Sequence, residues 1–329
     1  MPSRTWRPAR YDEWYTAAGG TYAFARGTTE MASVVAVPRS LERETYCLAG
    51  RTLAIEVDDE SVSQILQTTY VNARVQNTRA CDHTASLRRL SDGRLHVRFD
   101  RRTLAIGEPA PALPLPLLSA YYTTKEVFAR FAAAHPGSIA FYGALVAVGG
   151  AAVLILGPTT IGKTLFALHL SAHDSAFLGD ETALLDLRTA HVCALARKPA
   201  LRDSALAYLP SAEMRSSVSR ANAVLDTERG RFWYALGSED LCGIVPSDRS
   251  HRLAAVCVIR ERAQMHAVER VDITRALPAI MQRAYTRPAQ LAQLSSLRRA
   301  MRSVSFYEVT LADPRETAQA FLSEVAGCA

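Results

Sequence analysis

Short apolar runs alternate with polar turns through the first hundred residues, and their spacing predicts strands and one helix. Strands are predicted at Val34–Val37 and Thr52–Val57. Asp58–Ser61 then supplies a capping residue and carboxylates for a helix. Alternation on both sides of Ser91–Gly93 predicts a hairpin, with one face formed by Leu95, Val97 and Phe99. This segment is predicted to be a small mixed α/β or β-rich domain without recognisable chemistry.

A proline-rich segment, Gly107–Pro116, separates this first part from the rest of the chain. The boundary placed there predicts an N-terminal domain of residues 1–117, with a candidate role in substrate recognition, and a second domain of residues 118–329. The second domain is predicted to begin with a helix over Ser119–Ala134, which His135-Pro136-Gly137 ends. One side of that helix carries the apolar residues Val127, Phe128 and Phe131.

The pattern is most informative between residues 144 and 170. Two apolar runs, Ala144–Val148 and Ala151–Leu156, are joined by Gly149-Gly150 and predict an antiparallel hairpin. A loop of the form G-x-x-x-x-G-K-[ST] follows, and after it apolar residues recur at helical spacing. The residues of the loop are Gly157, Pro158, Thr159, Thr160, Ile161, Gly162, Lys163 and Thr164.

A strand, a glycine-containing loop and a helix in this order are typical of a phosphate-binding loop. Successive backbone N–H groups can surround a phosphate, and the positive end of the new helix faces the same anion. We expect Lys163 to reach the outer phosphates of a nucleotide, and the Thr164 hydroxyl to ligate Mg²⁺. The sequence therefore predicts a nucleotide site, with ATP and Mg²⁺ as the cofactors.

An acidic pair follows the next predicted strand. Ala176–Gly179 is a short apolar run, and Asp180-Glu181 comes directly after it. A phosphoryl-transfer site needs a base and a metal ligand beside its phosphate loop. Asp180 is our candidate base and Glu181 our candidate Mg²⁺ ligand.

Downstream of a predicted hairpin at residues 182–195, the chain carries several cations. Arg197, Lys198 and Arg202 are candidates for contacts with a transferring phosphoryl group or with an anionic end of the substrate. The alternative interpretation is a plain basic loop.

The remaining segments are predicted to be scaffold. They are a strand–turn–strand unit at 224–234, strands at 253–259 and 304–310, helices at 272–284 and 288–301, and a last helix capped by Asp313.

Composition narrows the class of protein. The 329 residues carry a formal net charge of +6 with a pI near 9.1, and no basic run resembles a nucleic-acid-binding tail. The six cysteines are scattered without a C-x-x-C pair, which favours reduced thiols and a cytoplasmic location. We expect no nucleic-acid partner.

Neither membrane insertion nor a histidine metal site is expected. The N-terminal residues have no long apolar core, so no secretory signal is predicted. The longest apolar stretch, Ala144–Leu156, is interrupted by two glycines and is too short to span a bilayer. His169 and His173 have the spacing of a helical pair but lack a third ligand nearby, so we interpret them as part of a polar helix face.

The residues from 141 to 186 resemble a known family. Gly143-x-Leu-Val, the paired apolar strands, the phosphate loop, A-L-x-L at 167–170 and Asp180-Glu181 are similar to the catalytic domain of HPr kinase/phosphorylase. They are also similar to HPr-kinase-like proteins of gene clusters for ribosomally made peptides, including kinases of lasso-peptide precursors. The resemblance implies an α/β fold: a P-loop catalytic domain like that of phosphoenolpyruvate carboxykinase, preceded by the small mixed α/β domain. It also implies that one acidic residue acts as base on a serine hydroxyl while the other helps to hold the metal.

The sequence departs from the family pattern at three positions. Tyr142 stands where the family commonly has histidine, which places any phosphorylase activity in question. Thr160 replaces the glycine that is usual in the middle of the loop, and Glu181 replaces an aspartate. The glycine-rich segment that HPr kinases use on their protein substrate has no convincing counterpart. These departures favour a dedicated kinase over a bifunctional enzyme.

Three functional hypotheses follow from the residues and the resemblance. The leading one is transfer of the γ-phosphoryl group of ATP to a hydroxyl, with serine of a peptide or small protein as the acceptor implied by the resemblance. A precursor peptide of a modified natural product, of the lasso type, is the preferred substrate. The alternatives are a small-molecule kinase and a nucleotide-binding regulatory module without transfer. HPr kinases form hexamers, so a homo-oligomer is a candidate assembly.

Overall fold

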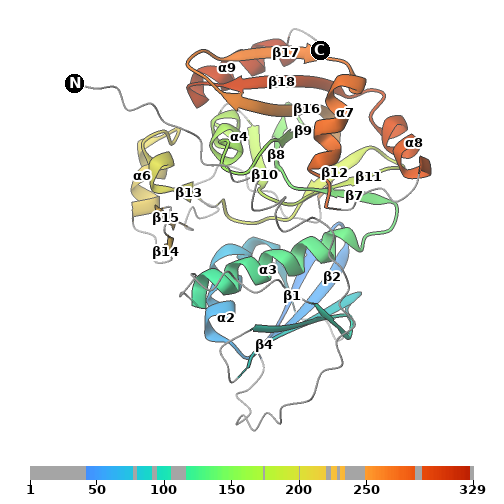
Figure 1. The fold of residues 1–329 in the computed structure, drawn as a ribbon, viewed down its shortest axis with the longest axis vertical. Helices are drawn as coiled ribbons and strands as arrows, with labels where there is room; N and C mark the ends of the chain where they lie inside the picture. The colour runs from blue at the N-terminus through green and yellow to red at the C-terminus, as the bar shows by residue number, and fades with distance from the viewer. Residues whose placement is uncertain are drawn as a thin grey trace. The chain divides into compact units, whose positions relative to one another are not determined.

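The computed structural model describes residues 42–76, 80–90, 95–104, 116–172, 175–199, 201–219, 224–227, 230–233, 249–285 and 291–326. The predicted strand at Val34–Val37, the turn at Ser91–Gly93 and most of the proline-rich segment lie outside these residues. Over the described ranges the chain is a mixed α/β protein with a six-stranded, a nine-stranded and a three-stranded sheet (Figure 1).

The first sheet contains the elements that precede residue 105. Its strand order is β3-β1-β2-β4-β5-β6. The strands are β1 (Glu42–Leu48), β2 (Arg51–Val57), β3 (Arg74–Val75), β4 (His83–Arg89), β5 (Leu95–Phe99) and β6 (Arg102–Leu104). Helix α2 (Glu60–Thr69) and the short 3₁₀ helix η1 (Val71–Ala73) follow β2, and β2 and β4 pair in parallel. The predicted cap is confirmed, because the Asp59 carboxylate accepts a hydrogen bond from the Val62 N–H at 3.0 Å.

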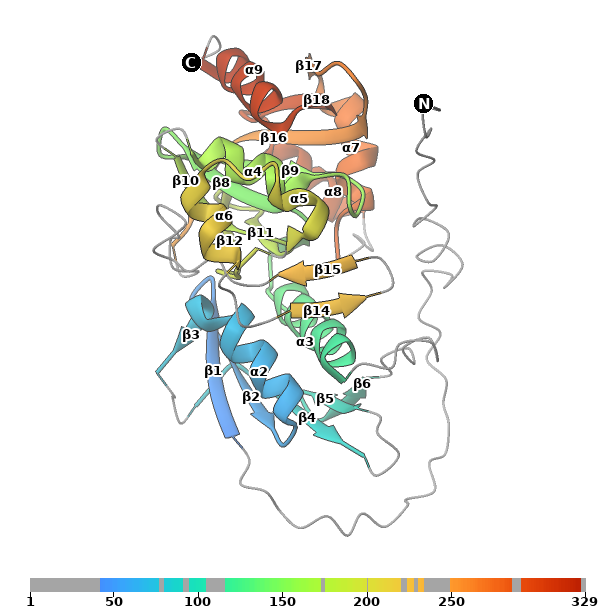
Figure 2. The same ribbon diagram turned by 90° about the vertical axis from the view of Figure 1, so that its left-hand side faces the viewer.

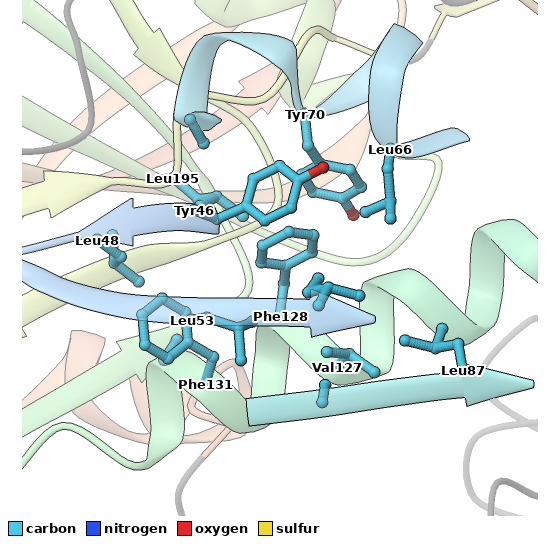
Figure 3. Close-up of a cluster of buried hydrophobic side chains, with 14 of the residues drawn as sticks. Tyr46, Leu48, Leu53, Leu66, Tyr70, Leu87, Val127, Phe128, Phe131 and Leu195 are labelled. Atoms are coloured by element: carbon cyan, nitrogen blue, oxygen red, sulfur yellow. The ribbon is translucent and has the colours of Figure 1, made fainter. Parts of the chain in front are cut away.

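Helix α3 (Pro116–Ala133) packs into the core of this first sheet. Phe128 stacks on Tyr70 at a centroid distance of 4.1 Å and meets the edge of Tyr46 at 5.2 Å (Figure 3). Val127 and Phe131 are buried in the same cluster, as the apolar stripe of the helix predicted. Leu195, which follows strand β12 (His191–Ala194) of the nine-stranded sheet, is buried in this cluster too. Residues on both sides of the boundary predicted at 117 therefore share one core.

The nine-stranded sheet carries the phosphate loop. Its main path has the order β10-β8-β9-β16-β12-β11-β7, and β18 pairs with both β16 and β17. The strands are β7 (Ser138–Phe141), β8 (Ala144–Val148), β9 (Ala151–Leu156), β10 (Ser175–Gly179), β11 (Ala183–Asp186), β12 (His191–Ala194), β16 (His251–Arg262), β17 (Ala267–Val271) and β18 (Ser305–Leu311). Strand β16 lies parallel to β9 and to β18, whereas β8 and β9 form the predicted antiparallel hairpin.

Helices cover both faces of this sheet (Figure 2). Side chains of β9 alternate, so that Val153 and Ile155 face one core while Leu154 and Leu156 face the other. The first core is closed by α4 (Lys163–Ser171) and α9 (Pro314–Ala326), and the second by α7 (Ile273–Gln282) and α8 (Leu291–Ala300). Two buried apolar faces explain why β9 is a continuous apolar run.

The third sheet is small and has the order β13-β15-β14. Its strands are β13 (Leu201–Arg202), β14 (Val224–Thr227) and β15 (Gly230–Trp233), and the helices α5 (Asp203–Leu206) and α6 (Ala212–Ser219) lie between β13 and β14 in the chain. The predicted pairing within 224–233 is confirmed. Among the described residues, no helix combines the length and apolar character needed to cross a bilayer.

Gly179, at the end of β10, is required by close packing. A Cβ atom at this position would lie 2.8 Å from the Cβ of Ala194 and would also press on the backbone carbonyl of Leu195. We expect Gly179→Ala to lower the free energy of unfolding by about 2–3 kcal/mol, the upper part of the range for overpacking, because neighbouring backbone would have to move. Chemical denaturation followed by circular dichroism measures this. Gly150→Ala is the control, since a Cβ there meets nothing within 4 Å and adds only the strain of a positive φ, about 1 kcal/mol. Equal losses in the two variants would contradict the packing argument.

Candidate active site

The phosphate loop connects β9 to α4, and its glycines are fixed by their neighbours. Gly157 and Gly162 have φ angles of 155° and 114°. A Cβ at Gly157 would lie 2.8 Å from the carbonyl oxygen of Ile259 in β16, and one at Gly162 would lie 2.6 Å from the side chain of Leu311 in β18. The loop thus sits against the carboxyl ends of parallel strands, where open α/β sheets bind ligands.

Thr160 occupies the left-handed region with φ of 70°. The threonine therefore does not prevent the backbone conformation that a glycine would adopt here. A non-glycine residue in this region stores on the order of 1–3 kcal/mol, and such strain is typical of ligand-binding loops.

Lys163 is buried and extends across the loop that precedes it. Its Nζ atom donates hydrogen bonds to the carbonyl oxygens of Gly157 at 3.1 Å and Pro158 at 2.8 Å. The same ammonium group lies 4.6 Å from the centre of the Tyr142 ring. Burial lowers the pKa of Lys163 to about 8, although the nearby Asp180 carboxylate opposes this shift.

Asp180 contacts the phosphate loop directly. Strand β10 pairs with β8, the neighbour of β9, and this pairing brings the residue after β10 to the loop. The Thr164 hydroxyl donates to Asp180 Oδ2 at 2.8 Å, and the Glu181 N–H donates to Oδ1 at 2.9 Å. Burial and the adjacent Glu181 charge raise the pKa of Asp180.

Glu181 faces a different set of partners. Its φ of 68° turns the backbone sharply after Asp180. Its Oε1 atom accepts from the Tyr121 hydroxyl at 2.9 Å and from Lys125 Nζ at 3.3 Å, and its Oε2 atom forms an ion pair with Arg197. Burial by itself would raise the pKa of Glu181, but the Arg197 and Lys125 charges hold it at about 2. The two adjacent carboxylates are therefore in opposite environments.

The three downstream cations predicted to contact phosphate or substrate lie in different surroundings. Arg197 has only 1% of its surface exposed, and it donates to the Tyr121 hydroxyl at 2.9 Å besides pairing with Glu181. The guanidinium also lies 5.7 Å from the centre of the Tyr70 ring. In this structure Arg197 holds Glu181 rather than facing solvent. The backbone N–H of Lys198 donates to the Thr69 carbonyl at 2.9 Å. Arg202 lies in β13, and its side chain is outside the described part of the structure.

Sequence reasoning missed Tyr121, Lys125 and Tyr285. The Tyr285 hydroxyl donates to the Glu181 carbonyl at 2.9 Å, and Lys125 Nζ lies 4.5 Å from the centre of the Tyr142 ring. Tyr121 and Lys125 are one helical turn apart on α3, so both reach Glu181 from the same side. One signal was available, because the chain has only three lysines, at positions 125, 163 and 198, among many arginines.

The oxygen atoms at the loop suit a hard cation. Mg²⁺ is bound in proteins through one or two carboxylates together with hydroxyls and substrate phosphates. Thr164 Oγ1 and Asp180 Oδ2 are such atoms and lie 2.8 Å apart. Within the described ranges, no group of three or more His, Cys, Asp or Glu could form an all-protein metal cage. His169 is instead hydrogen-bonded through Nε2 to the Tyr208 carbonyl at 2.7 Å, and His173 lies outside the described residues.

Comparisons with known proteins add little to the description of the site. No protein-family model and no curated protein matches the chain. Among solved structures, the HPr(Ser) kinase/phosphatase from Coxiella burnetii is similar over 57% of this chain and 97% of its own, with 11% sequence identity and a TM-score of 0.27. Because that TM-score is low, the likeness carries no argument about activity, and the candidate site stands on its own geometry.

Proposed function

We propose that this protein is an ATP-dependent kinase that transfers the γ-phosphoryl group to a hydroxyl. The observation that carries the proposal is the 2.8 Å hydrogen bond from Thr164 to Asp180. It joins a complete G-x-x-x-x-G-K-[ST] loop to a buried carboxylate, which are the two parts that hydroxyl phosphorylation requires. A glycine-containing loop that only capped a core helix would not need a carboxylate hydrogen-bonded to its threonine hydroxyl.

The roles of the residues follow from their positions. The loop amides surround the phosphates, and Lys163 leaves the carbonyls of Gly157 and Pro158 to contact the outer phosphates. The acceptor oxygen forms a bond to the γ-phosphorus, and the bond from that phosphorus to the β–γ bridging oxygen breaks. ADP leaves with the electron pair, and Asp180 takes the hydroxyl proton.

A bound Mg²⁺ would neutralise negative charge on the β- and γ-phosphates. Thr164 and an oxygen of the acidic pair would hold it. Glu181, the sequence-based candidate for this role, already has contacts with Lys125, Tyr121 and Arg197. Asp180 is therefore the carboxylate with the more direct access to the loop.

The acceptor is proposed to be a serine of a peptide or small protein, and a ribosomally made precursor peptide is the preferred candidate. This part rests on the resemblance of residues 141–186 to HPr-kinase-like proteins. The proposed acceptor is tested against two other outcomes. One is transfer to a small-molecule hydroxyl, and the other is nucleotide binding without transfer.

The test combines nucleotide binding with product analysis. We expect the full chain to bind ATP only with Mg²⁺ present, and Lys163→Ala to weaken binding at least tenfold, because a charged contact contributes about 1.5–3 kcal/mol. Mass spectrometry of candidate serine-containing peptides after incubation should show one added phosphoryl group. Transfer to a small-molecule hydroxyl alone would change the acceptor, and binding without any transfer would favour a regulatory module. Absence of Mg²⁺-nucleotide binding would contradict the proposal altogether.

A further inference from the structure

Lys125 is a second lysine at the candidate site, and it comes from a different element than the phosphate loop. Helix α3 presents its Nζ atom 3.3 Å from Glu181 Oε1 and 4.5 Å from the centre of the Tyr142 ring. The Lys163 ammonium group lies 4.6 Å from the same ring centre, and the Tyr285 ring meets the Tyr142 ring edge-on. Tyr142 therefore contacts two ammonium groups, of which the loop motif accounts for only one.

The charges of this cluster do not balance. Among the described residues, Lys125, Lys163 and Arg197 supply three positive charges, with Arg283 near enough to act on Lys163, whereas Asp180 and Glu181 supply two negative ones. Glu181 already has Arg197 as an ion-pair partner and Tyr121 as a donor. Buried charges are stable only when paired, so a positive excess in a buried cluster points to an anionic ligand.

The two cations on Glu181 differ in their access to such a ligand. Arg197 has 1% of its side chain exposed, whereas Lys125 has 22% exposed. An ammonium group is a compact charge with three donors, and one contact to Glu181 leaves donors for a second anion. Lys125 can therefore keep its contact with Glu181 and still bind a ligand.

We propose that Lys125 binds the terminal phosphoryl group of the nucleotide, on the side of the site where Glu181 lies. This inference rests on the proposed function. Loop amides of this type hold the inner phosphates, and the loop lysine reaches the β- and γ-phosphates. Lys125 contacts the same Tyr142 ring as that lysine, at 4.5 Å against 4.6 Å from its centre, so its charge can act on the group that is transferred. Lys125 is thus a catalytic residue supplied by a helix that packs in the core of the first sheet.

The test compares a nucleoside triphosphate with its diphosphate. Binding of a non-hydrolysable ATP analogue and of ADP, each with Mg²⁺, is measured by calorimetry on the full chain. We expect Lys125→Met to weaken the analogue about tenfold more than ADP, the effect of one lost charged contact. Lys125→Arg should retain most of the preference for the triphosphate. Arg130→Met, which removes a partly exposed cation of the same helix, is the matched control and should bind both nucleotides as the wild type does.

Distinct outcomes separate the two proposals. If the wild type binds neither nucleotide, the proposed function fails and this inference falls with it. If the wild type binds both, and Lys125→Met loses equal affinity for both or none, only the role of Lys125 is wrong. Lys125→Gln, a polar neutral side chain that can still donate to Glu181, replaces the methionine variant if that variant does not fold.

Discussion

Asp180→Asn is expected to lower the rate of phosphoryl transfer by about 10²–10⁴-fold, the usual contribution of a positioned base, while nucleotide binding stays close to wild type. The asparagine keeps an oxygen that can accept from the Thr164 hydroxyl or bind Mg²⁺, so the loop and the metal site should both be retained. It cannot take a proton from the acceptor. Single-turnover transfer to an identified substrate, together with calorimetric binding of Mg²⁺-ATP, measures the two effects separately.

Two results would change the role of Asp180. Normal transfer by Asp180→Asn would show that the residue is not the base. A loss that high Mg²⁺ concentrations restore would show that Asp180 acts through the metal rather than as the base. Asp186→Asn is the matched control, because Asp186 accepts hydrogen bonds from the N–H groups of Arg188 and Thr189 in an exposed turn. It should transfer at the wild-type rate.

Arg197→Met is expected to lower the free energy of unfolding by about 3 kcal/mol, since removal of one partner leaves a buried carboxylate without its ion pair. Arg197 and Glu181 are both almost inaccessible to solvent, and methionine fills much of the same volume. Lys125 remains beside Glu181, which keeps the expected loss at the lower end of the range for buried pairs. Chemical denaturation at neutral pH measures it.

A double-mutant cycle separates the ion pair from lost packing. Glu181→Gln in the Arg197→Met background removes the unpaired charge, so we expect the double variant to regain part of the lost stability. Arg130→Met removes a partly exposed ion pair with Glu126 and should change stability by less than about 1 kcal/mol. A double variant no more stable than Arg197→Met would show that the arginine acts through packing rather than through its charge.

Local structure was largely predictable from the sequence. Gly149 and Gly150 adopt φ angles of 57° and 82°, as the tight turn between two apolar strands requires. Asp313 accepts hydrogen bonds from the N–H groups of Arg315 and Glu316, so the predicted start of the last helix is confirmed. Turn and cap geometry depend on residues within a few positions of one another, which is why these features can be read from the chain.

Several strands were not predicted, among them β1, β7 and β17, and each of these three has a physical reason. β1 and β17 contain many polar or exposed positions, and β7 has only four residues. β7 and β17 pair with β11 and β18, which lie farther along the chain, whereas β1 pairs with β2 directly after it. The pattern of a short polar strand carries too little periodicity to reveal such partners.

The sequence by itself determined the phosphate loop, the hairpin before it and the acidic residues after β10, because each depends on neighbours along the chain. Only the tertiary structure decided that Asp180 meets Thr164 while Glu181 turns toward Arg197, Tyr121 and Lys125. These partners lie between 16 and 60 positions from the acidic pair. The packing of α3 and of the sheet strands decides which side chains surround each carboxylate. The adjacent residues Asp180 and Glu181 therefore differ in pKa and in chemistry.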